Sequence, residues 1–228
     1  MKKKIFFFII LITVLIIFFN KKILTYFLVK NISLWTEYQA ELAISNFDYI
    51  EGILEISKVK IKNKNNFFYK NVFESNKVII DFSYRSLFSN LVIINKLILI
   101  EPKIYFEIKN IDNNLNKKKY IDNLNLTETS LKKKSPKIYP KKTKDKNFII
   151  SSFFTKNSIA FIKYPDNEKK LKINLSEMSF VNVGNAASKT GQNFQHYKDV
   201  LKIILNDIFF RIPDEDLRNF IKKTYKIK

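Results

Sequence analysis

The sequence predicts an α+β fold with an N-terminal transmembrane helix, an antiparallel β-sheet and C-terminal amphipathic helices. Three patterns predict it: an apolar run over residues 5–19, apolar side chains on alternate positions in residues 47–109 and 148–183, and an apolar stripe at three-four spacing over residues 194–208. At 228 residues the chain is long enough to bury a core, and because it has no cysteine, no disulfide stabilises it.

The N-terminal segment follows three lysines and is apolar throughout residues 5–19 except at Thr13. As a helix it would reach roughly 22 Å, short of the ~30 Å hydrocarbon layer, so a cleaved signal peptide is an alternative. No small-x-small cleavage site follows, and we therefore favour an uncleaved anchor over residues 1–30. Its membrane residues would include Ile5, Phe8, Leu11, Leu15 and Phe19.

The short basic tail before this segment favours a cytoplasmic N-terminus. In a bacterium, the protein would then be a single-pass protein of the inner membrane with most of its chain in the periplasm.

The first block of the body, residues 31–109, is predicted to begin with a connector helix. Residues 34–45 carry an apolar stripe at helical spacing that includes Trp35, Tyr38 and Leu42.

Strands are predicted after this helix. Alternation is cleanest over residues 103–109, which indicates a half-buried antiparallel strand. A change of parity around Ser57 and Lys58 indicates a bulge or bend in one long strand. Residues 91–100 are apolar on both parities except at Asn95 and Lys96, which is typical of a strand buried on both sides.

A basic flexible linker is predicted over residues 110–146. Twelve lysines against four acids fall in residues 109–147, and the stretch has almost no periodicity. It is interpreted as a solvated loop, with attraction to anionic headgroups or nucleic acid as the alternative. The overall charge of +20 is discounted, because lysine, asparagine, isoleucine and phenylalanine dominate the chain as they do in proteins from AT-rich genomes.

The second block, residues 147–228, is predicted to hold more strands and two helices. Residues 148–154 and 158–164 could form a hairpin. The helix over residues 194–208 should lay its apolar stripe on the sheet, and the acids at 214–216 should open a shorter helix.

Residues for catalysis are hard to find. His196 is the only histidine, and with no cysteine it has no evident nucleophile or base to pair with. The three glycines are too scattered for a phosphate-binding loop. We predict no enzyme activity, no catalytic or metal-binding residues and no cofactor.

With these residues laid out, the chain resembles the AsmA-like proteins, relatives of TamB and of the chorein-type bridge-like lipid transfer proteins. The resemblance lies in Gly52-Ile-Leu-Glu-Ile-Ser-Lys-Val-Lys-Ile-Lys-Asn63, in residues 97–100 followed by Glu101-Pro102, and in residues 175–183 ended by Gly184. One departure is Lys64, where a proline often follows the asparagine. The resemblance implies a curved antiparallel sheet of the β-taco type with an apolar groove, and a role in lipid transport or outer-membrane and envelope homeostasis.

On this basis the expected partners are membrane lipids, a phospholipid above all, with envelope proteins as a second class and no nucleic acid. The alternative is a membrane-tethered scaffold or assembly factor without a ligand, in which the same apolar residues only form a core under the helix over residues 194–208. The predicted groove lining is Leu54, Ile56, Val78, Ile80, Phe82, Ile104, Phe106 and Ile108.

Overall fold

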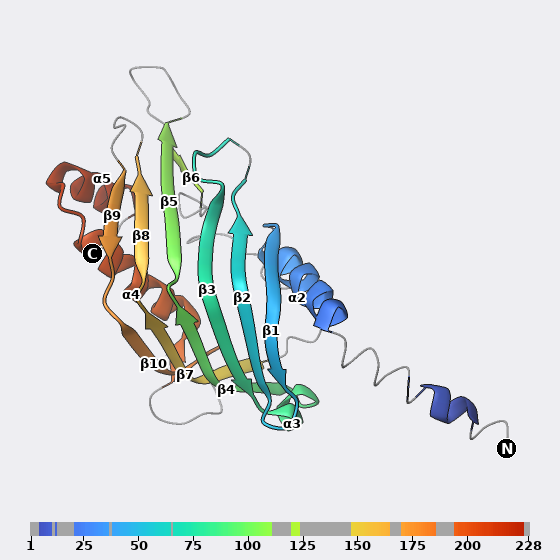
Figure 1. Ribbon diagram of the computed structural model, residues 1–228. Coiled ribbons are helices and arrows are strands. Elements are labelled where there is room, and N and C mark those ends of the chain that lie inside the picture. The colour runs from blue at the N-terminus through green and yellow to red at the C-terminus, as the bar shows by residue number, and fades with distance from the viewer. Residues whose placement is uncertain are drawn as a thin grey trace.

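The computed structural model shows one curved, 11-stranded sheet with helices packed against it (Figure 1). It describes residues 5–10, 12, 21–36, 38–64, 66–110, 120–123, 147–164, 170–185 and 194–225.

The first part of the chain forms an antiparallel meander. β1, β2 and β3 are hydrogen-bonded in that order, and β3 then pairs with β4 and with β5. A short helix, α3, joins β3 to β4, and β6 pairs with the end of β5. The bounds are β1 Ala40–Asp48, β2 Ile53–Lys62, β3 Asn71–Phe82, α3 Tyr84–Leu87, β4 Leu91–Ile100, β5 Lys103–Asn110 and β6 Tyr120–Asp122.

The second part of the chain extends the same sheet. β7 runs parallel to β4, β8 runs parallel to β5, and β10 and β9 pair antiparallel with β7 and β8. β11 pairs parallel with β10. The bounds are β7 Asn147–Lys156, β8 Ile159–Lys163, β9 Leu171–Asn174, β10 Met178–Gly184 and β11 Gln195–His196. The sheet is therefore mixed, and the prediction of an antiparallel sheet is wrong at its centre.

The hairpin predicted through residues 155–157 is also absent: β7 and β8 follow one another in the same direction. Asn157 lies between them with φ 54°, and Glu101 lies between β4 and β5 with φ 52°. Hydrogen bonding continues across both breaks, because the Glu101 N–H donates to Lys156 O at 2.9 Å and the Ile159 N–H donates to Pro102 O at 2.9 Å. Each break therefore bends a strand without ending the sheet.

A bend in β2 lies at the same level of the sheet. Lys58 has φ 54°, which confirms the bend predicted from the change of parity near this residue. In β3, the Ser75 hydroxyl donates to Lys77 O at 3.1 Å and Ile100 O at 2.9 Å, at the level where β4 gives way to β5. Kinks aligned across neighbouring strands account for the curvature of the sheet.

Within the described residues, three helices cover one face of the sheet, here called the inner face. They are α2 Lys21–Thr36, α4 Tyr197–Phe210 and α5 Glu215–Tyr225. The predicted helix over residues 34–45 is instead the end of α2 followed by β1. Ala40, Leu42 and Ile44 are more buried than the residues between them, a strand period that the wider helical stripe concealed.

The prediction of an N-terminal transmembrane helix is wrong. Among the residues that the structure describes, no helix combines the length and apolar character needed to cross a membrane. α2 has 16 residues, begins with two lysines, and packs Leu24 and Leu28 against the sheet. Of the predicted anchor residues, Ile5 and Phe8 are exposed in a helical stretch, and Leu11, Leu15 and Phe19 lie outside the described residues.

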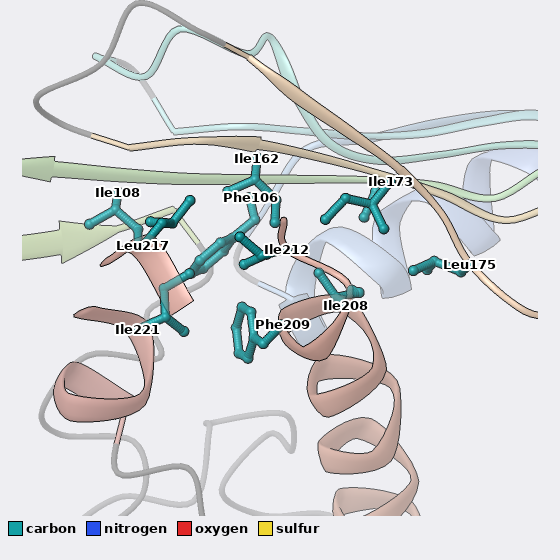
Figure 2. Packing of buried hydrophobic residues seen from close by; sticks show 11 residues of the cluster. Phe106, Ile108, Ile162, Ile173, Leu175, Ile208, Phe209, Ile212, Leu217 and Ile221 are labelled. Atoms are coloured by element: carbon teal, nitrogen blue, oxygen red, sulfur yellow. The ribbon is translucent and has the colours of Figure 1, made fainter. Parts of the chain in front are cut away.

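Most of the buried apolar side chains in the described part of the chain form three clusters on the inner face. The α2 cluster has Phe47, Leu54, Ile56, Val59 and Val78 at its centre. The α4 cluster has Phe153, Phe180, Val183 and Val200. The helix-pair cluster joins β5, β8 and β9 to α4 and α5 (Figure 2); its members are Phe106, Ile108, Ala160, Ile162, Ile173, Leu175, Ile208, Phe209, Ile212, Leu217 and Ile221.

Of the predicted linker, residues 110 and 120–123 belong to the described part of the chain, and the rest lies outside it. Tyr120–Asp122 forms β6, and Asp122 and Asn123 are buried. The Asn123 side chain donates to Tyr105 O at 2.7 Å and accepts from the Glu107 N–H at 2.9 Å. It therefore makes the two backbone hydrogen bonds that a neighbouring strand would make to β5.

Candidate functional site

A band of half-buried apolar side chains runs across the inner face between α2 and α4. We call it the apolar lane and define it by Ile80 and Phe82 of β3 and Leu97 and Leu99 of β4. The register of β3 and β4 places Ile80 directly opposite Leu97. Side chains two residues apart on a strand share a face, so the four form one surface.

The apolar lane connects the cores beneath the two helices. All four residues pack against the α2 cluster, and Leu97 and Leu99 also pack against the α4 cluster. Helices lie over the two sides of the sheet in Figure 1, and β3 and β4 pass between them. The four side chains keep partial exposure, whereas the central residues of the clusters on either side are buried.

Charged groups of these strands lie on the opposite, outer face. Asn95 donates to the Asp81 carboxylate at 2.8 Å, and the Lys96 ammonium lies 5.7 Å from the centre of the Phe154 ring. Alternation along the strands therefore keeps charge off the inner surface, whereas the outer face carries Asp81 and Lys96 beside the apolar pair Ile79 and Ile98. An uncharged apolar surface favours hydrocarbon over any polar ligand.

The structure divides the predicted groove lining into three groups. Leu54, Ile56 and Val78 are buried in the α2 cluster. Phe106 and Ile108 are each 1% exposed in the helix-pair cluster, with Ile104 packed against it. Ile80 and Phe82 lie in the apolar lane.

Phe106 and Ile108 are thus core residues under the C-terminal helices, as the alternative of a scaffold without a ligand predicted for them. The Phe106 ring lies 5.6 Å from the Phe209 ring, and Figure 2 shows it among Ile212, Phe209 and Ile221. Sequence analysis did not single out Leu97 and Leu99, because β4 is apolar on both parities and its alternation carries no signal of which face is open.

A buried carboxylate anchors the loop between β2 and β3 on the outer face. Glu107 is 1% exposed, and its Oε2 accepts hydrogen bonds from the backbone N–H groups of Phe68 at 2.7 Å and Tyr69 at 3.1 Å. Its Oε1 lies 3.6 Å from the Lys109 ammonium. Burial, and then the Glu107 charge, raise the pKa of Tyr69. These contacts hold a loop and leave no open site.

A row of aromatic rings lies beside this carboxylate. Tyr69 packs at 5.1 Å on Tyr105, which stacks at 5.1 Å on Phe161 with a 10° angle between the rings. Lys163 and Lys170 place their ammonium groups 4.7 and 4.1 Å from the Phe68 ring centre. Burial, followed by the charge and a hydrogen bond of Glu74, raises the pKa of Tyr105 to about 12. The row therefore joins the loop between β2 and β3 to β5 and β8 through ring contacts.

His196 and the first of the acids at 214–216 both make structural contacts. The His196 ring lies in β11 at 4.6 Å from the Tyr197 ring. Asp214 caps α5: its carboxylate accepts from the Leu217 N–H at 2.9 Å and from the Tyr164 hydroxyl at 3.1 Å. The Leu217 bond is the main cause that lowers the pKa of Asp214. Across the described residues, no cluster of three or more histidines and acids could hold a metal ion.

Comparison with known proteins adds no further constraint on these assignments. No family model matches the chain, and neither a curated protein nor a solved structure matches it.

Proposed function

We propose that the apolar lane binds the acyl chain of a membrane lipid, a phospholipid in the first instance, and that the protein acts in lipid transport or in maintaining the bacterial envelope. The proposed setting is the periplasm, and the protein is proposed not to be an enzyme. The observation that carries the proposal is an uncharged, partly exposed band that joins two closed cores on one face of a curved sheet. The envelope setting comes from the resemblance to the AsmA-like proteins.

The physical basis is the transfer of hydrocarbon from water onto the lane. Each buried CH₂ group gains about 0.8 kcal/mol, so contact along several methylenes gives useful affinity without any specific polar contact. Such a surface would select for acyl chains and tolerate different headgroups. This is the behaviour expected of a protein that carries bulk membrane lipid.

Lipid that co-purifies with the full-length protein tests the proposal. The protein is purified from whole cells in a mild detergent, and native mass spectrometry is combined with organic extraction of the same sample. We expect bound phospholipid near one per chain in the wild type and its loss in Leu97→Asp.

The control is Ile98→Asp, which places the same charge on the outer face of the same strand. It should retain the lipid. A wild type without lipid, or equal loss in both folded variants, would contradict the proposal.

A scaffold function is the second candidate, and α4 supplies the observation that favours it. Leu201, Ile203 and Phe210 are large apolar residues on this helix that remain exposed, and Phe210 is 79% exposed. A scaffold predicts that affinity purification from membranes recovers a protein at fixed stoichiometry and no enriched lipid. Phe210→Ser should then release that protein without changing the fold.

A further inference from the structure

One end of the sheet, here called the loop end, holds two large apolar side chains in solvent. It consists of the β1–β2 turn at residues 49–52 and of residues 83–90 around α3. Ile50 is 93% exposed in the turn, and Phe88 is 88% exposed just after α3. Figure 1 shows α3 and the β1–β2 turn at the same end of the sheet.

The turn that carries Ile50 is rigidly built. The Asp48 carboxylate accepts from the backbone N–H groups of Ile50 at 2.9 Å and Glu51 at 3.0 Å. Gly52 has φ 76°, and a Cβ there would lie 2.5 Å from Phe82 O, so the chain can turn here only with glycine. Ile50 therefore points outward from a fixed turn.

The segment that carries Phe88 is equally fixed. Ser86 is buried, and its hydroxyl donates to Ser83 O at 2.6 Å and accepts from the Ile93 N–H at 2.8 Å. The Ser89 hydroxyl donates to Ser86 O at 2.9 Å. Because Phe88 lies between these two serines, its backbone is held on both sides while its ring is in water.

The two segments form one unit. The Tyr84 hydroxyl donates to Asp48 O at 3.4 Å, and the Phe82 N–H donates to Gly52 O at 3.1 Å. An aromatic layer lies directly behind them: the Phe82 ring is 5.0 Å from Tyr84, and the Phe47 ring is 4.2 Å from Tyr49. Phe82 also belongs to the apolar lane, so the lane reaches the loop end.

We propose that the loop end docks on a lipid bilayer, with the side chains of Ile50 and Phe88 inserted among the acyl chains and the rings of Tyr49 and Tyr84 at the headgroup level. This order of side chains matches a membrane interface, where apolar groups lie among the acyl chains and aromatic rings with one polar end are favoured at the headgroups. Ile50 and Phe88 project from separate segments, and a deformable bilayer can accept both side chains at once.

The charges at the loop end indicate which lipid headgroups the bilayer needs. Arg85 and Glu51 are both exposed at the loop end, so it presents no net basic patch to anionic headgroups. Docking is therefore driven by apolar insertion, and neutral phosphatidylcholine vesicles are sufficient. Binding at this end should be nearly insensitive to salt, since screening weakens only the charge interactions.

The inference deepens the proposed function and rests on it in one respect: the docked end is where a lipid would enter the lane. Docking itself stands on the loop end alone. A protein whose lane binds no lipid could still dock, and a lane that binds lipid could be loaded elsewhere. The test below reads the loop end directly, so its failure is distinct from a failure to co-purify lipid.

The test uses tryptophan as a local probe of depth in the full-length chain. Trp35 is the only tryptophan, so Trp35→Phe gives a silent background into which Phe88→Trp or Ile50→Trp is introduced. The matched control is Phe210→Trp, an exposed aromatic position on α4. Each protein is reconstituted with neutral phosphatidylcholine vesicles that carry bromines on their acyl chains, and circular dichroism verifies the fold.

We expect the emission of tryptophan at 88 and at 50 to shift to the blue and to lose most of its intensity in brominated vesicles, at low and high salt alike. Tryptophan at 210 should remain unquenched. The proposal is overturned if positions 88 and 50 are not quenched, or if position 210 is quenched to the same extent. It is also overturned if the blue shift at 88 and 50 rises with protein concentration in the absence of vesicles, since the occupant is then a second copy of the chain.

Discussion

Replacing Phe106 by alanine tests whether this predicted lining residue is core. The side chain is 1% exposed and packs against Phe209 and both C-terminal helices. Truncating a fully buried phenylalanine costs about 3–5 kcal/mol, through lost transfer free energy and the cavity left behind. Since domains are stable by only about 5–15 kcal/mol, this change should lower the unfolding midpoint strongly.

The assay is urea unfolding of the full-length protein followed by far-ultraviolet circular dichroism. The matched control is Leu97→Ala, which removes a half-buried side chain from the apolar lane and should cost about 1–2 kcal/mol. Phe106→Ala should therefore unfold at clearly lower urea than Leu97→Ala. Equal midpoints would refute the division of the inner face into a closed core and an open lane.

Three further predictions concern single side chains. Glu107→Leu removes the acceptor of the part-buried N–H groups of residues 68–69, and hydrogen exchange should show their protection lost; unchanged protection would count against the anchor. Asp214→Ala removes the cap of α5 and should lower the thermal unfolding midpoint at neutral pH. Because the folded pKa of Asp214 is lowered, this difference should shrink as the pH falls below about 4, near the unfolded pKa; a difference that stays constant with pH would contradict it. The folded pKa of Tyr105 is raised to about 12. The stability that this residue adds is therefore fully present below pH about 10, its unfolded pKa, and is lost as the pH rises toward the folded value. Tyr105→Phe should reduce this loss of thermal stability at alkaline pH, and an unchanged dependence on pH would rule the prediction out.

Period-two alternation predicted the strands well where one face is buried and the other carries charge. Residues 103–109 show this: Phe106 and Ile108 point into the core, and Tyr105 lies on the outer face. The bend at Lys58 was visible for the same reason, since a residue with positive φ shifts the parity of everything after it. The local sequence pattern is sufficient to predict a strand when each position clearly favours either the core or the solvent.

Strand order could not be obtained in this way. β4 and β7 are parallel neighbours although the predicted linker separates them in sequence, and no residue pattern encodes which distant strand is adjacent. The direction of β8 depends on the kink at Asn157, where asparagine permits both a hairpin turn and a bend with positive φ. The predicted hairpin and the predicted antiparallel centre failed together for this reason.

The apolar lane was only partly predictable. Alternation places Ile80 and Phe82 on the inner face, but it does not say which inner-face residues a helix covers. That depends on where α2 and α4 end on the sheet, which is a property of the assembled fold. For the same reason, Phe106 and Ile80 look alike in sequence and differ in the structure.

The measurement that tests the central claim most directly is site-specific photo-crosslinking in living cells. A benzophenone amino acid is placed either at Leu97, on the inner face, or at Ile98, on the outer face of the same strand, and crosslinked products are analysed for lipid. The proposed function predicts a phospholipid adduct from position 97 and none from position 98. Adducts of equal yield at both positions, or a protein adduct alone at position 97, would contradict lipid binding on the apolar lane.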